Sequence, residues 1–90
     1  MKYRIFLTNQ AKRDLINFPL SIQRRIVDKL EYFEKQPKPF QYAKKLKNSH
    51  LGSYRFRIGD YRAIFDVEKD GTIHVLMVLR IKHRKDIYVL

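Results

Sequence analysis

Residues 54–65 read YRFRIGDYRAIF, and this short stretch decides the predicted fold. Aromatic and aliphatic side chains alternate with arginines up to Gly59, and the alternation resumes after Asp60, as in strands with one buried face. Gly-Asp, with glycine first, is a two-residue loop of the kind that a type II′ turn favours. The stretch therefore predicts two antiparallel strands joined by a tight turn.

The two-residue turn also predicts which residues of the hairpin face one another. It places Arg57 opposite Arg62 and Arg55 opposite Ile64. Because side chains alternate between the two faces of a strand, the hairpin has an apolar face formed by Tyr54, Phe56, Ile58, Tyr61, Ala63, Phe65 and Val67. The other face carries Arg55, Arg57, Arg62, Ile64 and Asp66.

The second face carries a charge pattern that stability alone does not favour. Arg57 and Arg62 are predicted to have Cβ atoms about 4.5–5.5 Å apart, and like charges so placed destabilise a sheet. The planar guanidinium group binds phosphate oxygens in pairs, so the face fits a phosphate-binding site. In the alternative interpretation, Asp66 and a loop carboxylate neutralise the arginines, and the face is only solvated.

The flanking segments complete an α+β fold. Residues 2–7 alternate as a strand, and residues 73–81 are apolar on both faces, which predicts a central strand. Two helices are predicted between these strands, the first with Ala11, Leu15 and Phe18 on one face. The second begins near Ser21, and its apolar stripe consists of Ile22, Ile26, Leu30 and Phe33.

The predicted order is thus β-α-α-β-β-β, a small, mostly antiparallel sheet packed on an N-terminal helical hairpin. The chain of 90 residues is predicted to be a single domain. Residues 36–53 are predicted to be a loop, and its lysines are candidates for RNA binding or, equally, for plain solvation: Lys44, Lys45 and Lys47. Arg80 and Lys82 are predicted to reach the arginine face, followed by His83 and Arg84.

Composition narrows the classes of function. The net charge of +11 favours a polyanionic partner, first nucleic acid and then an acidic protein. There are no cysteines, and the histidines lack metal-ligand spacing, so neither a metal nor another cofactor is expected. We find no signal peptide and no apolar run long enough to cross a membrane, so the prediction is a cytoplasmic protein without a membrane partner.

Two motifs together resemble a known family. YRFRIGDYRAIF, followed by KHRKDIY, is similar to the RelE/ParE toxins of type II toxin–antitoxin systems, and TNQAKRDL and KLKNSHLGSYR fit as well. The resemblance covers nearly the whole chain and implies a small curved antiparallel sheet with two N-terminal helices. RelE-like members cleave mRNA in the ribosomal A site without a metal, whereas ParE-like members poison DNA gyrase.

The resemblance also implies partners. An antitoxin neutralises these toxins by wrapping them with an acidic or amphipathic segment, and the complex often represses its own operon. The expected partners are therefore a cognate antitoxin, the ribosome with its mRNA, and operator DNA only through the antitoxin complex.

Roles for the hairpin arginines follow from the resemblance. Arg55 and Arg57 match positions where cleaving members place basic residues, often lysines, beside the scissile phosphate. Arg62 matches an arginine that stabilises the transition state. Arginine is a poor general base because its pKa exceeds about 12, so the base stays open among His83, a lysine, Tyr88 and a ribosomal group.

The tail contributes the remaining site residues. Lys82 and Arg84 lie near a cationic position that helps the leaving oxygen, and Tyr88 matches a tyrosine that stacks on a base. This set favours a ribosome-dependent endoribonuclease, in which the 2′-OH attacks the neighbouring phosphate. A gyrase inhibitor and a catalytically weak relative that binds nucleic acid or antitoxin are the alternatives.

Overall fold

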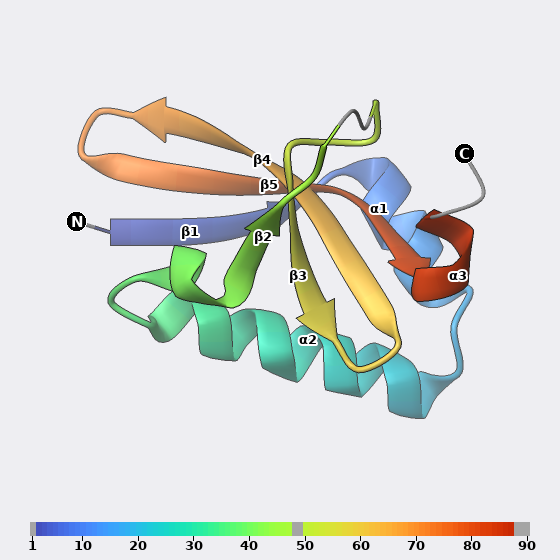
Figure 1. Ribbon diagram of the computed structural model, residues 1–90. Helices are drawn as coiled ribbons and strands as arrows, with labels where there is room; N and C mark the ends of the chain where they lie inside the picture. The colour runs from blue at the N-terminus through green and yellow to red at the C-terminus, as the bar shows by residue number, and fades with distance from the viewer. Residues whose placement is uncertain (1, 48–49, 88–90) are drawn as a thin grey trace.

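The computed structural model describes residues 2–47 and 50–87, which form a five-stranded sheet in the order β1-β5-β4-β3-β2 (Figure 1). The strands are β1 (Lys2–Leu7), β2 (Ala43–Lys45), β3 (Tyr54–Ile58), β4 (Tyr61–Asp70) and β5 (Ile73–His83). The helical elements are α1 (Asn9–Ile16), α2 (Leu20–Lys35), the 3-10 helix η1 (Pro39–Tyr42) and α3 (Arg84–Ile87). Among the described strands, only β1 and β5 pair in parallel, so the predicted α+β fold with a mostly antiparallel sheet is confirmed.

The β3–β4 hairpin has the predicted register. Arg57 pairs with Arg62 and Arg55 pairs with Ile64. Gly59 adopts a φ of 60°, a left-handed conformation that glycine reaches without a Cβ clash. The two-residue turn and the assignment of side chains to faces are therefore both confirmed.

The apolar face of the hairpin packs against α1 and α2. Phe33 of α2 stacks on Phe56 of β3 with ring centroids 4.5 Å apart, and Phe56 stacks on Phe65 of β4 at the same distance. Ala11 of α1 and Ile26 of α2 are fully buried in the same cluster. The helices thus cover one face of the sheet and leave the arginine face on the other side.

Residues 36–53, predicted to be a loop, contain η1 and the edge strand β2. β2 is only three residues long and reads AKK, so it has no alternation that would indicate a strand. Its strand conformation comes from pairing with β3. β5 also extends past its predicted end through Lys82 and His83, and the tail then begins α3.

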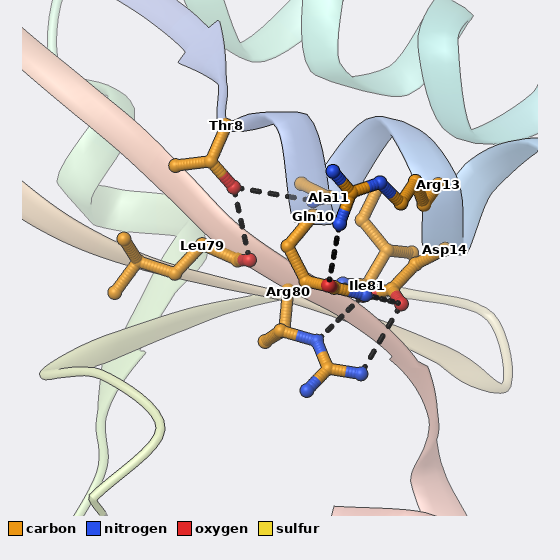
Figure 2. A network of polar contacts seen from close by, with 8 residues as sticks. All are labelled: Thr8, Gln10, Ala11, Arg13, Asp14, Leu79, Arg80 and Ile81. Carbon is orange, nitrogen blue, oxygen red and sulfur yellow. Dashed lines mark hydrogen bonds and ion pairs between the residues drawn. The ribbon is translucent and has the colours of Figure 1, made fainter.

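A polar junction joins α1 to β5 where β1 has ended (Figure 2). The Thr8 hydroxyl donates to the Leu79 carbonyl at 3.1 Å and accepts from the Ala11 amide at 3.1 Å, which caps α1. The Asp14 carboxylate accepts from the Ile81 amide at 3.0 Å. The side chains of the cap residue Thr8 and of Asp14 in α1 therefore satisfy backbone groups of β5 that lie beyond its pairing with β1.

In the described part of the chain, no helix is long and apolar enough to span a membrane.

Candidate nucleic-acid interface

Three cations form a row across the sheet face that the helices leave uncovered. Arg57 of β3 pairs with Arg62 of β4, and Arg62 pairs with Lys82 of β5. Directly paired residues point to the same face, and neighbouring strands lie about 4.8 Å apart. We call these three residues the cation row.

Arg62, at the centre of the row, is held rigidly. Its side chain is only 6% exposed. Its Nη1 donates to the Gly59 carbonyl at 2.8 Å and to the Tyr61 carbonyl at 2.9 Å, so the hairpin turn itself binds the guanidinium. Burying a charge is costly unless hydrogen bonds compensate it, and these bonds fix where the charge lies.

A second row runs beside the first, two residues further along each strand. Lys44 of β2 pairs with Arg55, Arg55 pairs with Ile64, and Ile64 pairs with Arg80. Ile64 is fully buried because Gly52 packs over it, so close that a Cβ on Gly52 would lie 2.7 Å from Ile64 Cγ2. Lys44 and Arg55 therefore extend the cationic face toward the β2 edge.

The other two predicted loop lysines do not share the register of Lys44. Lys45 pairs with Tyr54, a residue of the apolar face, and Lys47 follows the end of β2. Both side chains are exposed. Of the three lysines, Lys44 is the one that the sheet aligns with the arginines.

Arg80 lies on the arginine face as predicted, because it pairs with Ile64, and its guanidinium binds Asp14 there. Its RNA-binding role stays a prediction. Its Nε lies 2.8 Å and its Nη2 3.2 Å from the two carboxylate oxygens of Asp14 (Figure 2). Burial alone raises the pKa of Asp14, but hydrogen bonds from Arg80, the Ile81 amide and Gln10 outweigh it and lower that pKa. The same bond to Asp14 raises the pKa of Arg80. These contacts give Arg80 a structural role.

The carboxylates of Asp66 and Asp60 have different partners in the structure. Asp66 accepts the Ser53 amide at 2.7 Å and so secures the loop over the sheet. Asp60 instead lies 3.6 Å from Nε of Arg84, whose amide also donates to the Asp60 carbonyl at 2.7 Å. The contact of Asp66 with Ser53 does not support the alternative interpretation, in which Asp66 neutralises the arginines, because its carboxylate binds the loop backbone.

His83 does not join Lys82 on the cationic face. It pairs with Tyr61, a residue of the apolar face, and the two rings meet edge to face with centroids 5.3 Å apart. Its Nδ1 accepts the Lys85 amide at 3.3 Å. Neighbouring residues of a strand point to opposite faces, so His83 lies on the face opposite Lys82, and its predicted RNA-binding role stays a prediction. Tyr88, the predicted base-stacking residue, lies outside the described residues.

The arrangement is suited to binding an anion and stabilising negative charge. Arg57 is exposed, Lys82 is half-buried and Arg62 is buried, so the row presents charges that differ in exposure to solvent. Guanidinium groups remain protonated at every physiological pH and therefore stabilise charge without removing protons. Fold and site together define a small basic α+β protein with a cationic sheet face.

Comparison with known proteins identifies the family. Residues 5–88 match the family model described as "ParE toxin of type II toxin-antitoxin system, parDE". The chain is also 30% identical over 88 residues to Toxin RelG of Mycobacterium tuberculosis, covering 98% of both chains. The protein therefore belongs to the RelE/ParE family and is a toxin of the type II toxin–antitoxin class.

Solved structures support the same fold. The RelBE2 toxin–antitoxin complex of Mycobacterium tuberculosis contains a chain that matches with a TM-score of 0.73 and 27% identity, covering 93% of this chain and 100% of that one. A chain of the RelE–RelB complex of Pyrococcus horikoshii matches with a TM-score of 0.64 and 28% identity, covering 93% of this chain and 97% of that one. A chain of the RelB–RelE complex of Methanococcus jannaschii matches with a TM-score of 0.59 and 28% identity, covering 92% of this chain and 94% of that one.

Proposed function

We propose that this toxin is a ribosome-dependent endoribonuclease that cleaves mRNA in the ribosomal A site. The observation that supports it is the cation row, in which Arg57, Arg62 and Lys82 align across three strands on the uncovered face. The pairing of like charges has a cost in stability, and binding a scissile phosphate would offset that cost. Arg55 extends the same face by one further cation.

In the proposed reaction, the 2′-OH of a ribose attacks the adjacent 3′-phosphate. The P–O bond to the next nucleotide breaks, which leaves a 2′,3′-cyclic phosphate and a 5′-OH. Negative charge grows on the phosphoryl oxygens, and Arg57 and Arg62 would stabilise it. Lys82 or Arg84 would lie toward the leaving oxygen, and Tyr88 would stack on a base. The 2′-OH proton passes to a base other than these arginines, because a guanidinium stays protonated in proteins and cannot accept a proton.

We also propose a cognate antitoxin as partner. The three solved relatives are all toxin–antitoxin complexes. A net charge of +11 favours an acidic or amphipathic segment that wraps the toxin. Operator DNA would then be contacted only through that complex, and the toxin would act in the cytoplasm, where its ribosomes are.

Primer extension on an mRNA, with and without translating ribosomes, tests the proposal. We expect wild-type cleavage only with ribosomes, and Arg57→Ala to lower its rate about 100-fold, the usual effect of losing one charge-stabilising donor. Arg57 is exposed, so this variant is expected to fold, and Lys12→Ala on α1 is the matched exposed-cation control. Absent cleavage, or equal rates for Arg57→Ala and wild type, would refute the endoribonuclease.

The family model supports one competing function, because its description names a ParE toxin. A gyrase inhibitor would block DNA supercoiling at toxin concentrations that leave mRNA intact. We expect no such inhibition. A protein that neither cleaves mRNA nor inhibits gyrase would instead be a relative that has kept only its binding function.

A further inference from the structure

One side of helix α2 carries two cations and an aromatic ring. Arg25, Lys29 and Tyr32 recur at spacings of four and three residues, so they share one side of the helix, and all three are exposed. Glu31 and Glu34 lie on the opposite flank, where they line a groove beside β1. Glu34 also accepts the Ile5 amide of that edge strand at 2.7 Å. The cationic flank is therefore the one that faces β3.

The cationic flank borders a hollow at the tip of the β3–β4 hairpin. The hollow measures about 470 Å³ and is lined by Arg25, Lys29, Arg57, Ile58 and Gly59. None of these described lining residues is acidic. Arg25 approaches the turn closely, because its Nη1 would lie 3.6 Å from a Cβ on Gly59. Figure 1 shows α2 passing beside this turn. Arg57 belongs to both the hollow and the cation row, so the two are continuous.

Exposed aromatic rings lie next to the same cations. Tyr32 is 46% exposed and Tyr42 of η1 is 39% exposed, and their rings meet edge to face with centroids 5.9 Å apart. Lys29 Nζ lies 4.9 Å from the Tyr32 ring centroid. Proteins that bind single-stranded nucleic acids combine cations with exposed aromatic rings, because phosphates pair with the cations and bases stack on the rings. An acidic peptide would need the cations but not the rings.

We propose that single-stranded RNA binds this surface, which we call the α2 surface and define as Arg25, Lys29, Tyr32, Tyr42 and Arg57. Phosphates occupy the hollow, and a base stacks on the tyrosines. This RNA is the same mRNA whose scissile phosphate lies on the cation row, and the α2 surface binds the nucleotides that follow that phosphate. In this respect the inference rests on the proposed function, although RNA binding can be measured without cleavage.

Fluorescence anisotropy with a labelled oligouridylate of about twelve nucleotides tests the α2 surface. We expect Arg25→Gln to weaken binding about fivefold and to reduce the slope of log affinity against log salt by about 0.7, the value for one phosphate contact on a single strand. Arg24→Gln is the matched control, because it removes the same charge from the neighbouring position of α2, outside the hollow. We expect it to weaken binding less than about twofold.

The stacking contribution is tested separately. Tyr32→Leu should weaken binding about tenfold with an unchanged salt slope, whereas Tyr32→Phe, which keeps the ring, should bind like wild type. Urea denaturation of each variant verifies that it is folded, and Arg25→Gln tests the surface independently if Tyr32→Leu does not fold.

Two results would overturn the inference. Equal effects of Arg24→Gln and Arg25→Gln would show that only overall charge matters. Unchanged RNA affinity in Tyr32→Leu, with loss of polyglutamate peptide binding in Arg25→Gln, would assign the surface to an acidic protein. Failure of the wild type to cleave mRNA on ribosomes would refute the proposed function alone, because oligouridylate binding is measured without ribosomes.

Discussion

Replacing Asp14 with asparagine tests whether the α1–β5 junction supports the fold. Asp14 and Arg80 are separated by 66 residues in the chain, and their ion pair joins α1 to the end of β5 that carries Lys82. Asparagine has nearly the same shape but no charge. The variant therefore removes the electrostatic part of the junction while it keeps the packing.

The expected cost follows from the contacts. Asp14 accepts from two guanidinium nitrogens at 2.8 and 3.2 Å and from the Ile81 amide at 3.0 Å. Hydrogen bonds to charged groups contribute about 1.5–3 kcal/mol each. Asparagine keeps an acceptor for the amide, and Arg80, whose side chain is 32% exposed, regains water. We therefore expect Asp14→Asn to lower the free energy of unfolding by about 2 kcal/mol and Tm by about 10 °C.

The effect should depend on pH in a defined direction. Burial raises the pKa of Asp14, but the bonds from Arg80 and the Ile81 amide outweigh it and leave the pKa below its ordinary value. A carboxyl with a lowered folded-state pKa stabilises the fold above its unfolded pKa, and this stabilisation is lost as pH falls through the folded-state pKa. The difference between wild type and Asp14→Asn should thus be full at neutral pH and shrink below about pH 4.

Urea denaturation followed by circular dichroism measures this difference. Gln10→Ala serves as control, because Gln10 is exposed and donates one bond of 3.2 Å to Asp14; we expect it to cost less than about 0.5 kcal/mol. The reasoning is refuted if Asp14→Asn unfolds within about 0.5 kcal/mol of wild type, or if the difference stays constant from neutral to acid pH.

Three further substitutions test the fold by the same denaturation assay. Thr8→Ala removes the cap of α1 and the bond to Leu79, and should cost about 1 kcal/mol, whereas Thr8→Ser should cost little; equal effects would contradict the capping role. Gly52→Ala places a Cβ 2.7 Å from Ile64 Cγ2 and should cost about 1–3 kcal/mol through overpacking, so an unchanged midpoint would show that the loop yields. Phe33→Ala empties a core site that is 2% exposed and should cost about 3–5 kcal/mol; a loss below about 1 kcal/mol would mean that the core refills the space.

The β3–β4 hairpin shows how far local sequence signals reach. A two-residue turn determines the register of its own strands, and alternation determines the faces. The pairing of Arg57 with Arg62 and of Arg55 with Ile64 is therefore predictable from the twelve residues of the hairpin alone. The opposite orientation of His83 and Lys82 follows from the same rule, but it required knowing that β5 extends that far.

Edge strand β2 marks the limit of these signals. Its residues, AKK, form a strand because β3 offers them hydrogen-bonding partners. The same pairing aligns Lys44 with Arg55 and leaves Lys45 opposite Tyr54. Neighbouring lysines of this segment thus lie on opposite faces of the sheet, which composition alone does not reveal.

The sequence by itself determined the hairpin, the order of the main elements and the basic character of the protein, since these depend on neighbouring residues or on composition. Only the tertiary structure decided that Arg80 pairs with Asp14, that Asp66 holds the loop, and that α2 turns Arg25 toward the hairpin. The pattern of side chains along the sequence determines structure only over a few neighbouring residues. These contacts instead depend on how helices and strands from distant parts of the chain pack together. The face on which the cations gather was therefore predictable, and the carboxylates that restrain them were not.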